Sequence, residues 1–554
     1  MVRRLLFVAA AILLVGISLT ACQSKRVSRV TCPAGKLCLE YGNGADPNTL
    51  DPQLAQAVNE SAILRELFQG MVTDGPDGGP VPGLAKSWEV SPDGLVWTFH
   101  MRPALWSDGV PVTARDFVYA YRRMLDPKTG SAYAYLLYVI KNAQPLNSGH
   151  ASPDSLGVRA LDDETLQLTL EHPASYLPQL LKHQAFYPLP QHAVEKWGAR
   201  WVDPSHYVSN GPYVLKIWRL SDYVRIEKNP RFEGADKVCF DVVDFYPTAD
   251  PISAERRVLR GELDVNNSIT ANRVPHLRAD PISAKFVHTH TYLNTLYLAF
   301  NRRDVPALKD VRVRQAISMA IDRDFITQKI LRAGQIPAYG FVPPGIAGYL
   351  PKGARWPAPY WATWTLAQRE DEARRLMAAA GYGPGNRLRL QLKTTIGQGT
   401  PVAAQSIQAD LKGIGIDIDF RQEDGIVVFE SFNIRDFQLG LAGWVADYDD
   451  PMTYLGLMKS DTGQQNFGDY NNPAYDALLN AADNEPDAGK RAADLARAEQ
   501  LMLNDADIAP LFTSVNLNLV NPHITGWVDN DADVHPISDL CRNDAPAKAI
   551  KPAA

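Results

Sequence analysis

The sequence has few cysteines, no apolar segment long enough to cross a membrane and no excess of charge of one sign. Its 554 residues exclude a small disulfide-stapled scaffold and predict three or four domains or one elaborated fold. Lys and Arg (56) nearly balance Asp and Glu (62), and without a dense basic stripe nucleic acid is not an expected partner. The 45% of hydrophobic and 21% of charged residues are typical of a packed globular protein and exclude a disordered chain.

The apolar run near the N-terminus is too short for a membrane-spanning helix. Residues 5–19 follow two arginines and number 15, against the ~20 that a spanning helix needs. They predict a signal peptide over residues 1–21. The run ends in Leu19-Thr20-Ala21-Cys22, which resembles the lipobox of bacterial lipoproteins, so Cys22 is expected to carry a lipid anchor. The alternative is an ordinary secretory signal cleaved at Ala21; both interpretations export the protein.

Four cysteines remain after Cys22, an even number that suits an oxidising compartment. Four cysteines allow three pairings. Cys32 and Cys38 can close a small loop containing a turn, which leaves Cys239 and Cys541 as a second pair. Free buried thiols or a zinc site are the alternatives, and zinc is disfavoured because no histidines stand at ligand spacing from these cysteines.

The organisation along the chain changes near its middle. Residues 75–113 carry Gly- and Pro-rich turns between short apolar stretches, which predict strands, and Thr113 begins a helix with a capping-box pattern. Leucines alternate at 388–392, a helical pattern spans about 402–412, and apolar residues alternate again at 416–420. This strand, helix and strand unit predicts an α/β region with parallel strands.

Signatures of catalysis and metal binding are absent or incomplete. The segment YVSNG (207–211) lacks the first glycine of a nucleophile elbow, and the sequence has no P-loop and no HExxH. Residues 529–533 begin like a calcium loop without the glycine and glutamate that complete one. His288 and His290 share one face of a predicted strand, but the sequence identifies no third ligand, which favours a solvated strand face. We therefore expect neither an enzyme nor a metal or cofactor.

Ordered sequence blocks cover most of the chain. PGLAKSWE (82–89), SPDG (91–94) and WSDGVPVTARDFV (106–118) are followed by NGPY (210–213) and GWVADY (443–448). These blocks resemble, in the same order, the oligopeptide-binding proteins of ABC importers, which belong to a family of large extracytoplasmic peptide and nickel binders. The resemblance extends from about residue 40 to 540 and is greatest to the oligopeptide branch.

The resemblance implies an α/β, bilobal periplasmic-binding-protein fold (class II-like) with an additional β-rich domain and a ligand cleft between the lobes. It places Cys239 and Cys541 in one lobe, which favours their pairing. The implied divisions are a discontinuous lobe I (30–74, 207–290 and 515–554), a β-rich domain II (75–206) and an α/β lobe III (291–514).

Asp447 matches the carboxylate that meets the α-ammonium group of the peptide in this family. Gly443, Trp444 and Val445 are expected to form the strand beside the ligand, and Tyr448 completes the same block. An alternative is that Asp447 only shapes the turn that follows the strand.

The sequence departs from the family at the other end of the ligand. The arginine expected two residues before Gly443, which helps to hold the peptide carboxylate, is Leu441. Arg435 lies six residues upstream of Leu441 and is a candidate substitute, although an exposed loop arginine is an equal alternative. The departure leaves open a different peptide length or an unusual cargo.

The function implied is that of a lipid-anchored, monomeric receptor in the periplasm or another extracytoplasmic space. It captures oligopeptides, closes over them and delivers them to an ABC permease, with no chemistry on the ligand. The alternatives are another cargo, such as a cell-wall peptide, nickel chelate, haem or opine-like compound, and a role as an envelope peptide sensor or chaperone.

Overall fold

The computed structural model describes residues 32–350, 354–396 and 400–543. The predicted signal peptide and Cys22 lie outside the described residues. Among the described helices, none is long and apolar enough to cross a bilayer.

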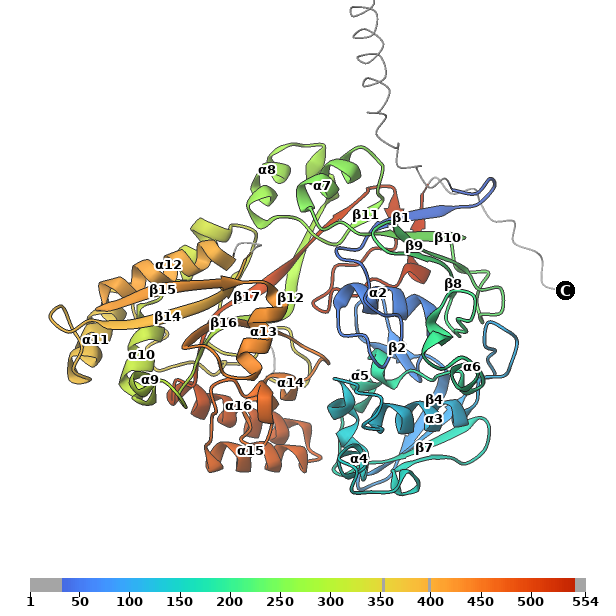
Figure 1. The fold of residues 1–554 in the computed structure, drawn as a ribbon, viewed down its shortest axis with the longest axis horizontal. Coiled ribbons are helices and arrows are strands. Elements are labelled where there is room, and N and C mark those ends of the chain that lie inside the picture. The colour runs from blue at the N-terminus through green and yellow to red at the C-terminus, as the bar shows by residue number, and fades with distance from the viewer. Residues whose placement is uncertain (1–31, 351–353, 397–399, 544–554) are drawn as a thin grey trace, which may run out of the picture.

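A mixed sheet runs through both halves of the molecule (Figure 1). Within the described ranges it has 11 strands in the order β15-β14-β16-β12-β17-β11-β1-β10-β9-β8, with β13 beside β17. The bounds of these strands are β1 Cys38–Gly42, β8 Tyr213–Arg219, β9 Tyr223–Lys228, β10 Val242–Tyr246, β11 Val265–Asn266, β12 Val287–Phe300, β13 Ile336–Pro337, β14 Leu388–Thr395, β15 Ile416–Glu423, β16 Leu439–Val445 and β17 Ile508–Val520.

Two long antiparallel strands connect the halves. β12 has 14 residues and β17 has 13, and they pair from Val287 with Leu519 to Ala299 with Ile508. The start of β12 lies beside the β1 and β11 region, and its end pairs with β16 in the other half. The register is irregular between Thr291 and Thr295, where an irregularity of this kind bends a strand.

The N-terminal half, on the right of Figure 1, contains β1 to β11 and a separate four-stranded antiparallel sheet in the order β4-β5-β7-β6. One continuous apolar core joins the two sheets and includes Leu64, Phe99 and Tyr121. Remaining bounds are β2 Val72–Asp74, β3 Pro80–Pro82, β4 Ala85–Val90, β5 Val96–Met101, β6 Val158–Ala160, β7 Thr165–Thr169, α2 Val58–Leu67, α3 Ala114–Leu125, α4 Ala143–Asn147, α5 Leu177–Leu181, α6 Gln191–Trp197, α7 Pro251–Leu259 and α8 Val274–Ala279.

α3 begins where the sequence predicts. The backbone N–H of Thr113 donates to the carboxylate of Asp116 at 2.8 Å, which is one arm of the predicted capping box.

The C-terminal half, on the left of Figure 1, confirms the predicted strand, helix and strand unit. β14 and β15 pair in parallel from Leu388 with Ile416, and α12 connects them. Helices α9 to α16 surround this part of the sheet, so the chain forms a bilobal α/β fold. Their bounds are α9 Pro306–Lys309, α10 Val311–Ala320, α11 Leu366–Ala379, α12 Thr400–Gly413, α13 Gly425–Asn433, α14 Met452–Leu455, α15 Pro473–Asp483 and α16 Ala488–Asn504.

The end of the chain returns to the N-terminal half. Cys541, in β19 (Cys541–Arg542), is bonded to Cys239, which is 302 residues earlier in the sequence. A second disulfide joins Cys32 and Cys38. The long-range disulfide fastens the C-terminal segment, which also contains β18 (Ile524–Thr525), to the half in which the described chain begins.

Candidate functional site

Asp447 lies just beyond the end of β16, in a cavity between the two halves. The cavity has a volume of about 70 Å³. Its N-terminal wall includes Arg65, Asp74 and Lys182, and its C-terminal wall includes Asp447 and Asp449. Charges of both signs therefore face one another across the boundary between the halves.

The half-buried carboxylate of Asp447 has a tyrosine for a partner and not a cation. The hydroxyl of Tyr135, in the 3-10 helix Ala134–Val139 of the N-terminal half, donates to Oδ2 at 2.5 Å. Burial raises the pKa of Asp447 to about 6, and the hydrogen bond from Tyr135 opposes that rise. None of the ion pairs within the described residues includes Asp447. The site can therefore accept a positively charged group.

Aromatic contacts close the boundary beside Asp447. The rings of Tyr176 and Tyr448, one from each half, stack with centroids 5.5 Å apart. The guanidinium of Arg491 lies 4.9 Å from the Tyr176 ring and forms an ion pair of 2.7 Å with Asp450. The structure is thus a closed form, and a 70 Å³ cavity holds a few water molecules, not a peptide. Entry of a larger ligand requires the halves to separate.

β16 presents part of one edge beside this cavity. On one side Gly443, Trp444 and Val445 pair with β12. On the other side the pairs with β14 reach only Leu439 and Gly440, so along the described chain residues 441–445 are paired on one edge. Such an edge can pair with an extended segment of another chain.

The side chains of the predicted strand differ in their surroundings. Trp444 is half-buried, and its Nε1 donates to the hydroxyl of Thr453 at 3.4 Å. Val445 is 38% exposed and lines the cavity together with Asp447. Leu441 is buried in the core of the C-terminal half.

Arg435 is not among the residues that line this cavity. Its backbone has a φ of 64°, and its guanidinium donates to the carbonyl oxygens of Gly463 at 3.2 Å and Asn466 at 3.3 Å. The cations that do line the cavity are Arg65 and Lys182, which form ion pairs with Asp74 at 3.3 Å and 3.1 Å. Sequence reasoning missed both, because neither stands in a motif near Asp447.

The comparisons with known proteins identify the family. Residues 79–466 match the family described as bacterial extracellular solute-binding proteins, family 5, middle. The chain belongs to this family. The periplasmic oligopeptide-binding protein OppA of Escherichia coli is 35% identical over 505 residues, which are 90% of this chain and 91% of OppA.

Two solved structures also resemble this family 5 protein. The murein tripeptide-binding protein MppA of Escherichia coli superposes with a TM-score of 0.83 at 35% identity, covering 92% of this chain and 99% of MppA. The complex of Haemophilus influenzae OppA with the peptide RPPGFSPFR gives 0.81 at 32% identity, again covering 92% and 99%. The bilobal fold of solute-binding proteins predicted from the sequence is confirmed.

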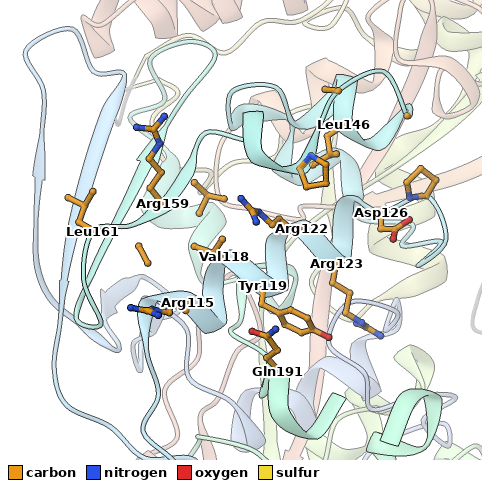
Figure 2. A pocket seen from close by; sticks show the side chains of 16 residues that line it. Arg115, Val118, Tyr119, Arg122, Arg123, Asp126, Leu146, Arg159, Leu161 and Gln191 are labelled. Atoms are coloured by element: carbon orange, nitrogen blue, oxygen red, sulfur yellow. The ribbon is translucent and has the colours of Figure 1, made fainter. Parts of the chain in front are cut away.

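A larger groove of this family 5 protein lies elsewhere, along α3 and β6 of the N-terminal half (Figure 2). It has a volume of about 1100 Å³ and is surrounded by four arginines. Three of these form ion pairs within the same half: Arg115 with Asp163, Arg122 with Asp154 and Arg123 with Asp51. None of its lining residues belongs to the cavity of Asp447, so the groove is not part of the site between the halves.

A group of possible metal ligands lies beside the cleft. His288 and His290 do share one face of β12, and each meets an aspartate of the segment that follows β18. His290, Asp533 and His535 can each place one ligand atom within 4.8 Å of the others. The group contains His290 but not His288, and its other two members come from a distant segment. The expected solvated strand face is wrong for His290, whose side chain is only 8% exposed.

Proposed function

We propose that the protein is an extracytoplasmic receptor that captures short peptides between its halves and delivers them to the permease of an ABC importer. The observation that carries the proposal is Asp447, a half-buried carboxylate in the cleft of a family 5 fold that forms no ion pair within the described residues. The α-ammonium group of a peptide supplies the missing charge. A charge-assisted hydrogen bond of this kind is short and strong when both partners are shielded from water.

The edge of β16 is our candidate for the backbone contacts of the ligand. Residues 441–445 pair with β12 alone among the described strands, which leaves main-chain donors and acceptors on the other edge. A peptide that adds as a strand uses these groups whatever its side chains are. Binding through the backbone is consistent with a receptor for many different sequences.

Arg65 and Lys182 are our candidates for the ligand carboxylate. They line the same cavity as Asp447 but come from the opposite half, and Asp74 holds both in place. A zwitterionic ligand that joins Asp447 to these cations therefore bridges the two halves and stabilises a closed complex, whose cavity is wider than that of the ligand-free closed form. This arrangement substitutes for the arginine that Leu441 replaces.

Capture requires an opening and closing cycle. In the open form the hydroxyl of Tyr135 leaves Asp447, and the bend of β12 between Thr291 and Thr295 absorbs the rotation. When a peptide binds, its ammonium group takes the place of that hydroxyl as the partner of Asp447. The protein performs no chemistry on the ligand.

We further propose that the chain is exported, anchored through a lipid on Cys22 and active as a monomer at the membrane. A cell-wall peptide is a second candidate cargo. It is favoured by the likeness to MppA, which is described as a murein tripeptide-binding protein.

The deciding experiment is native mass spectrometry of the full chain purified from cells, followed by calorimetric titration with di- to pentapeptides and with a murein tripeptide. We expect peptides to co-purify and at least one length class to bind. If no peptide co-purifies and none binds, the peptide function is refuted. Tight binding of the murein tripeptide alone would select the second candidate.

A further inference from the structure

Three side chains meet where β12, β17 and the segment after β18 come together. Nε2 of His290 lies 3.2 Å from Oδ1 of Asp533, and Nε2 of His535 lies 3.1 Å from the same oxygen. The exposed fractions of these side chains are 8% for His290, 15% for Asp533 and 4% for His535. The group is therefore enclosed and has two imidazoles directed at one carboxylate.

The hydrogen bonds of His290 fix its tautomer. Its Nδ1 lies 3.1 Å from the carbonyl oxygen of Thr291, and a carbonyl oxygen only accepts, so Nδ1 carries the hydrogen. In the neutral ring the lone pair is then on Nε2, which is buried and lies 3.2 Å from Oδ1 of Asp533. A lone pair and a carboxylate attract each other only through a positive species between them, which is either a proton or a metal ion. A carbonyl oxygen on Nδ1 is also the usual outer support of a metal-bound histidine.

Two of the three separations between ligand atoms suit a small tetrahedral ion, and the third, between the two histidine nitrogens, is within 4.8 Å. With bonds of about 2.0–2.1 Å, such an ion separates neighbouring ligand atoms by about 3.3–3.4 Å. The distances of 3.1 Å and 3.2 Å to Oδ1 of Asp533 are close to that separation. Nδ2 of Asn518, on β17, donates to Asp533 at 2.8 Å, and the ring of Trp527 stacks on His535 with centroids 3.6 Å apart. Asn518 and Trp527 thus hold Asp533 and His535, respectively, in their orientations.

We propose that His290, Asp533 and His535 form a binding site for a divalent transition-metal ion of the Zn²⁺ type. Two imidazoles and a carboxylate are ligands that Zn²⁺ accepts, and three protein ligands leave a fourth position for water. The ion joins the segment after β18 to the start of β12. Because Ala532 and Val534 line the cavity of Asp447, the ion fixes one wall of that cavity. This site does not depend on which solute the cleft binds.

The test uses the full chain purified without a polyhistidine tag and treated with a chelator. Calorimetry with Zn²⁺ should give one saturable equivalent, and Co²⁺ should give the visible absorption of a tetrahedral site. His290→Gln and His535→Gln should each weaken Zn²⁺ binding at least about 100-fold. Loss of a residue that only supports a metal ligand weakens binding by up to about 100-fold, and loss of the ligand itself should cost at least as much. The matched control is His288→Gln, on the same face of β12, whose ring pairs with Asp529 at 3.0 Å and is not a proposed ligand. It should bind Zn²⁺ like the unmodified chain.

The proposal is overturned if the unmodified chain binds no stoichiometric Zn²⁺, or if His290→Gln binds it as tightly. X-ray absorption of the Zn²⁺-loaded chain is independent of any variant and should show two imidazoles on the metal; none or one refutes the site even if a variant fails to fold. Quenching of tryptophan fluorescence by Ni²⁺ should fall in Trp527→Phe, since that ring stacks on His535. Quenching that is unchanged in Trp527→Phe would place the ion elsewhere.

Discussion

Replacing Asp447 by Asn should remove most of the affinity for peptides with a free N-terminus. Among the described residues the carboxylate has the Tyr135 hydroxyl as its side-chain partner and no cation, so the ligand ammonium is its counter-charge in the closed complex. Removing one member of a buried charge pair costs about 3–5 kcal/mol, since the other charge stays desolvated. That cost corresponds to a loss of affinity of roughly 100-fold to several thousand-fold.

A thermodynamic cycle measured by calorimetry isolates the contribution of the contact between Asp447 and the ligand ammonium group. The four titrations combine the unmodified chain or Asp447→Asn with trialanine or N-acetyl-trialanine. Acetylation should weaken binding to the unmodified chain about as much as the substitution does, and it should change binding to the variant by no more than about twofold. Asp449→Asn is the matched control, because this carboxylate lines the same cavity but accepts the backbone N–H of Ala347 at 2.7 Å.

The reasoning would be refuted if the effects of acetylation and of Asp447→Asn on the binding free energy were additive. If acetylation weakens binding equally in the variant and in the unmodified chain, the ammonium group contacts something other than Asp447. If Asp449→Asn loses as much affinity as Asp447→Asn, the cavity responds to its total charge and not to one contact. In either case a peptide function could stand, and only the role of Asp447 would fall.

The other predictions concern pH, the disulfide and the anchor. Peptide affinity should fall as the pH drops below about 6, because the closed ligand-free form, in which burial raises the pKa of Asp447 to about 6, is then protonated and competes with the peptide complex. Tyr135→Phe removes a hydrogen bond that lowers this pKa, so it should move the midpoint of calorimetric affinity upward; a flat profile would contradict this. Replacing Cys239 and Cys541 by Ser should lower the free energy of unfolding in urea by about 2–5 kcal/mol, whereas unchanged stability would show that the bond does not form. Cys22→Ala should move the protein from the membrane fraction to the soluble fraction, and an unchanged distribution would exclude the lipid anchor.

Local patterns predicted the parts of the fold that depend on neighbouring residues. The alternation of Leu388, Leu390 and Leu392 identified β14, because side chains in a strand alternate between faces and one face is buried here. The capping residues Thr113 and Asp116 marked the start of α3, because they satisfy backbone donors within one turn. Both patterns depend on a few neighbouring residues, so they can be recognised in the sequence without knowledge of the tertiary structure.

The partners of the candidate site could not be predicted in the same way. Tyr135 reaches Asp447 from 312 residues away, and in the opposite half Arg65 lies in α2 whereas Lys182 directly follows α5. Only the folded arrangement of the halves brings these groups together. The same holds for His290, for which the sequence favoured a solvated strand face, because Asp533 and His535, the other members of its group, lie beyond β18.

The pKa of Asp447 makes closure depend on the charge of the ligand. In the closed form the pKa is raised from 3.8 to about 6. Because the pKa of Asp447 is higher in the closed form, closing becomes less favourable as the pH rises from about 4 to 6. Above pH 6 the carboxylate is ionised in both forms, and the whole free-energy cost of burying its charge opposes closing. Two pKa units correspond to about 3 kcal/mol, or roughly 100-fold in the closing equilibrium, where the open form hydrates the carboxylate fully. An ammonium group removes this cost in the closed form, so it drives closure in a way that a neutral ligand does not.

It follows that Asp447→Asn, in which no carboxylate has to be buried, should close without a ligand. Its amide oxygen can still accept the hydrogen bond from Tyr135. At pH 7.5 small-angle scattering should therefore give the ligand-free variant a smaller radius of gyration than the ligand-free unmodified chain. Adding peptide should contract the unmodified chain and leave the variant almost unchanged. Equal radii without ligand would show that the buried charge does not act on closure, and the ammonium group would then contribute to affinity alone.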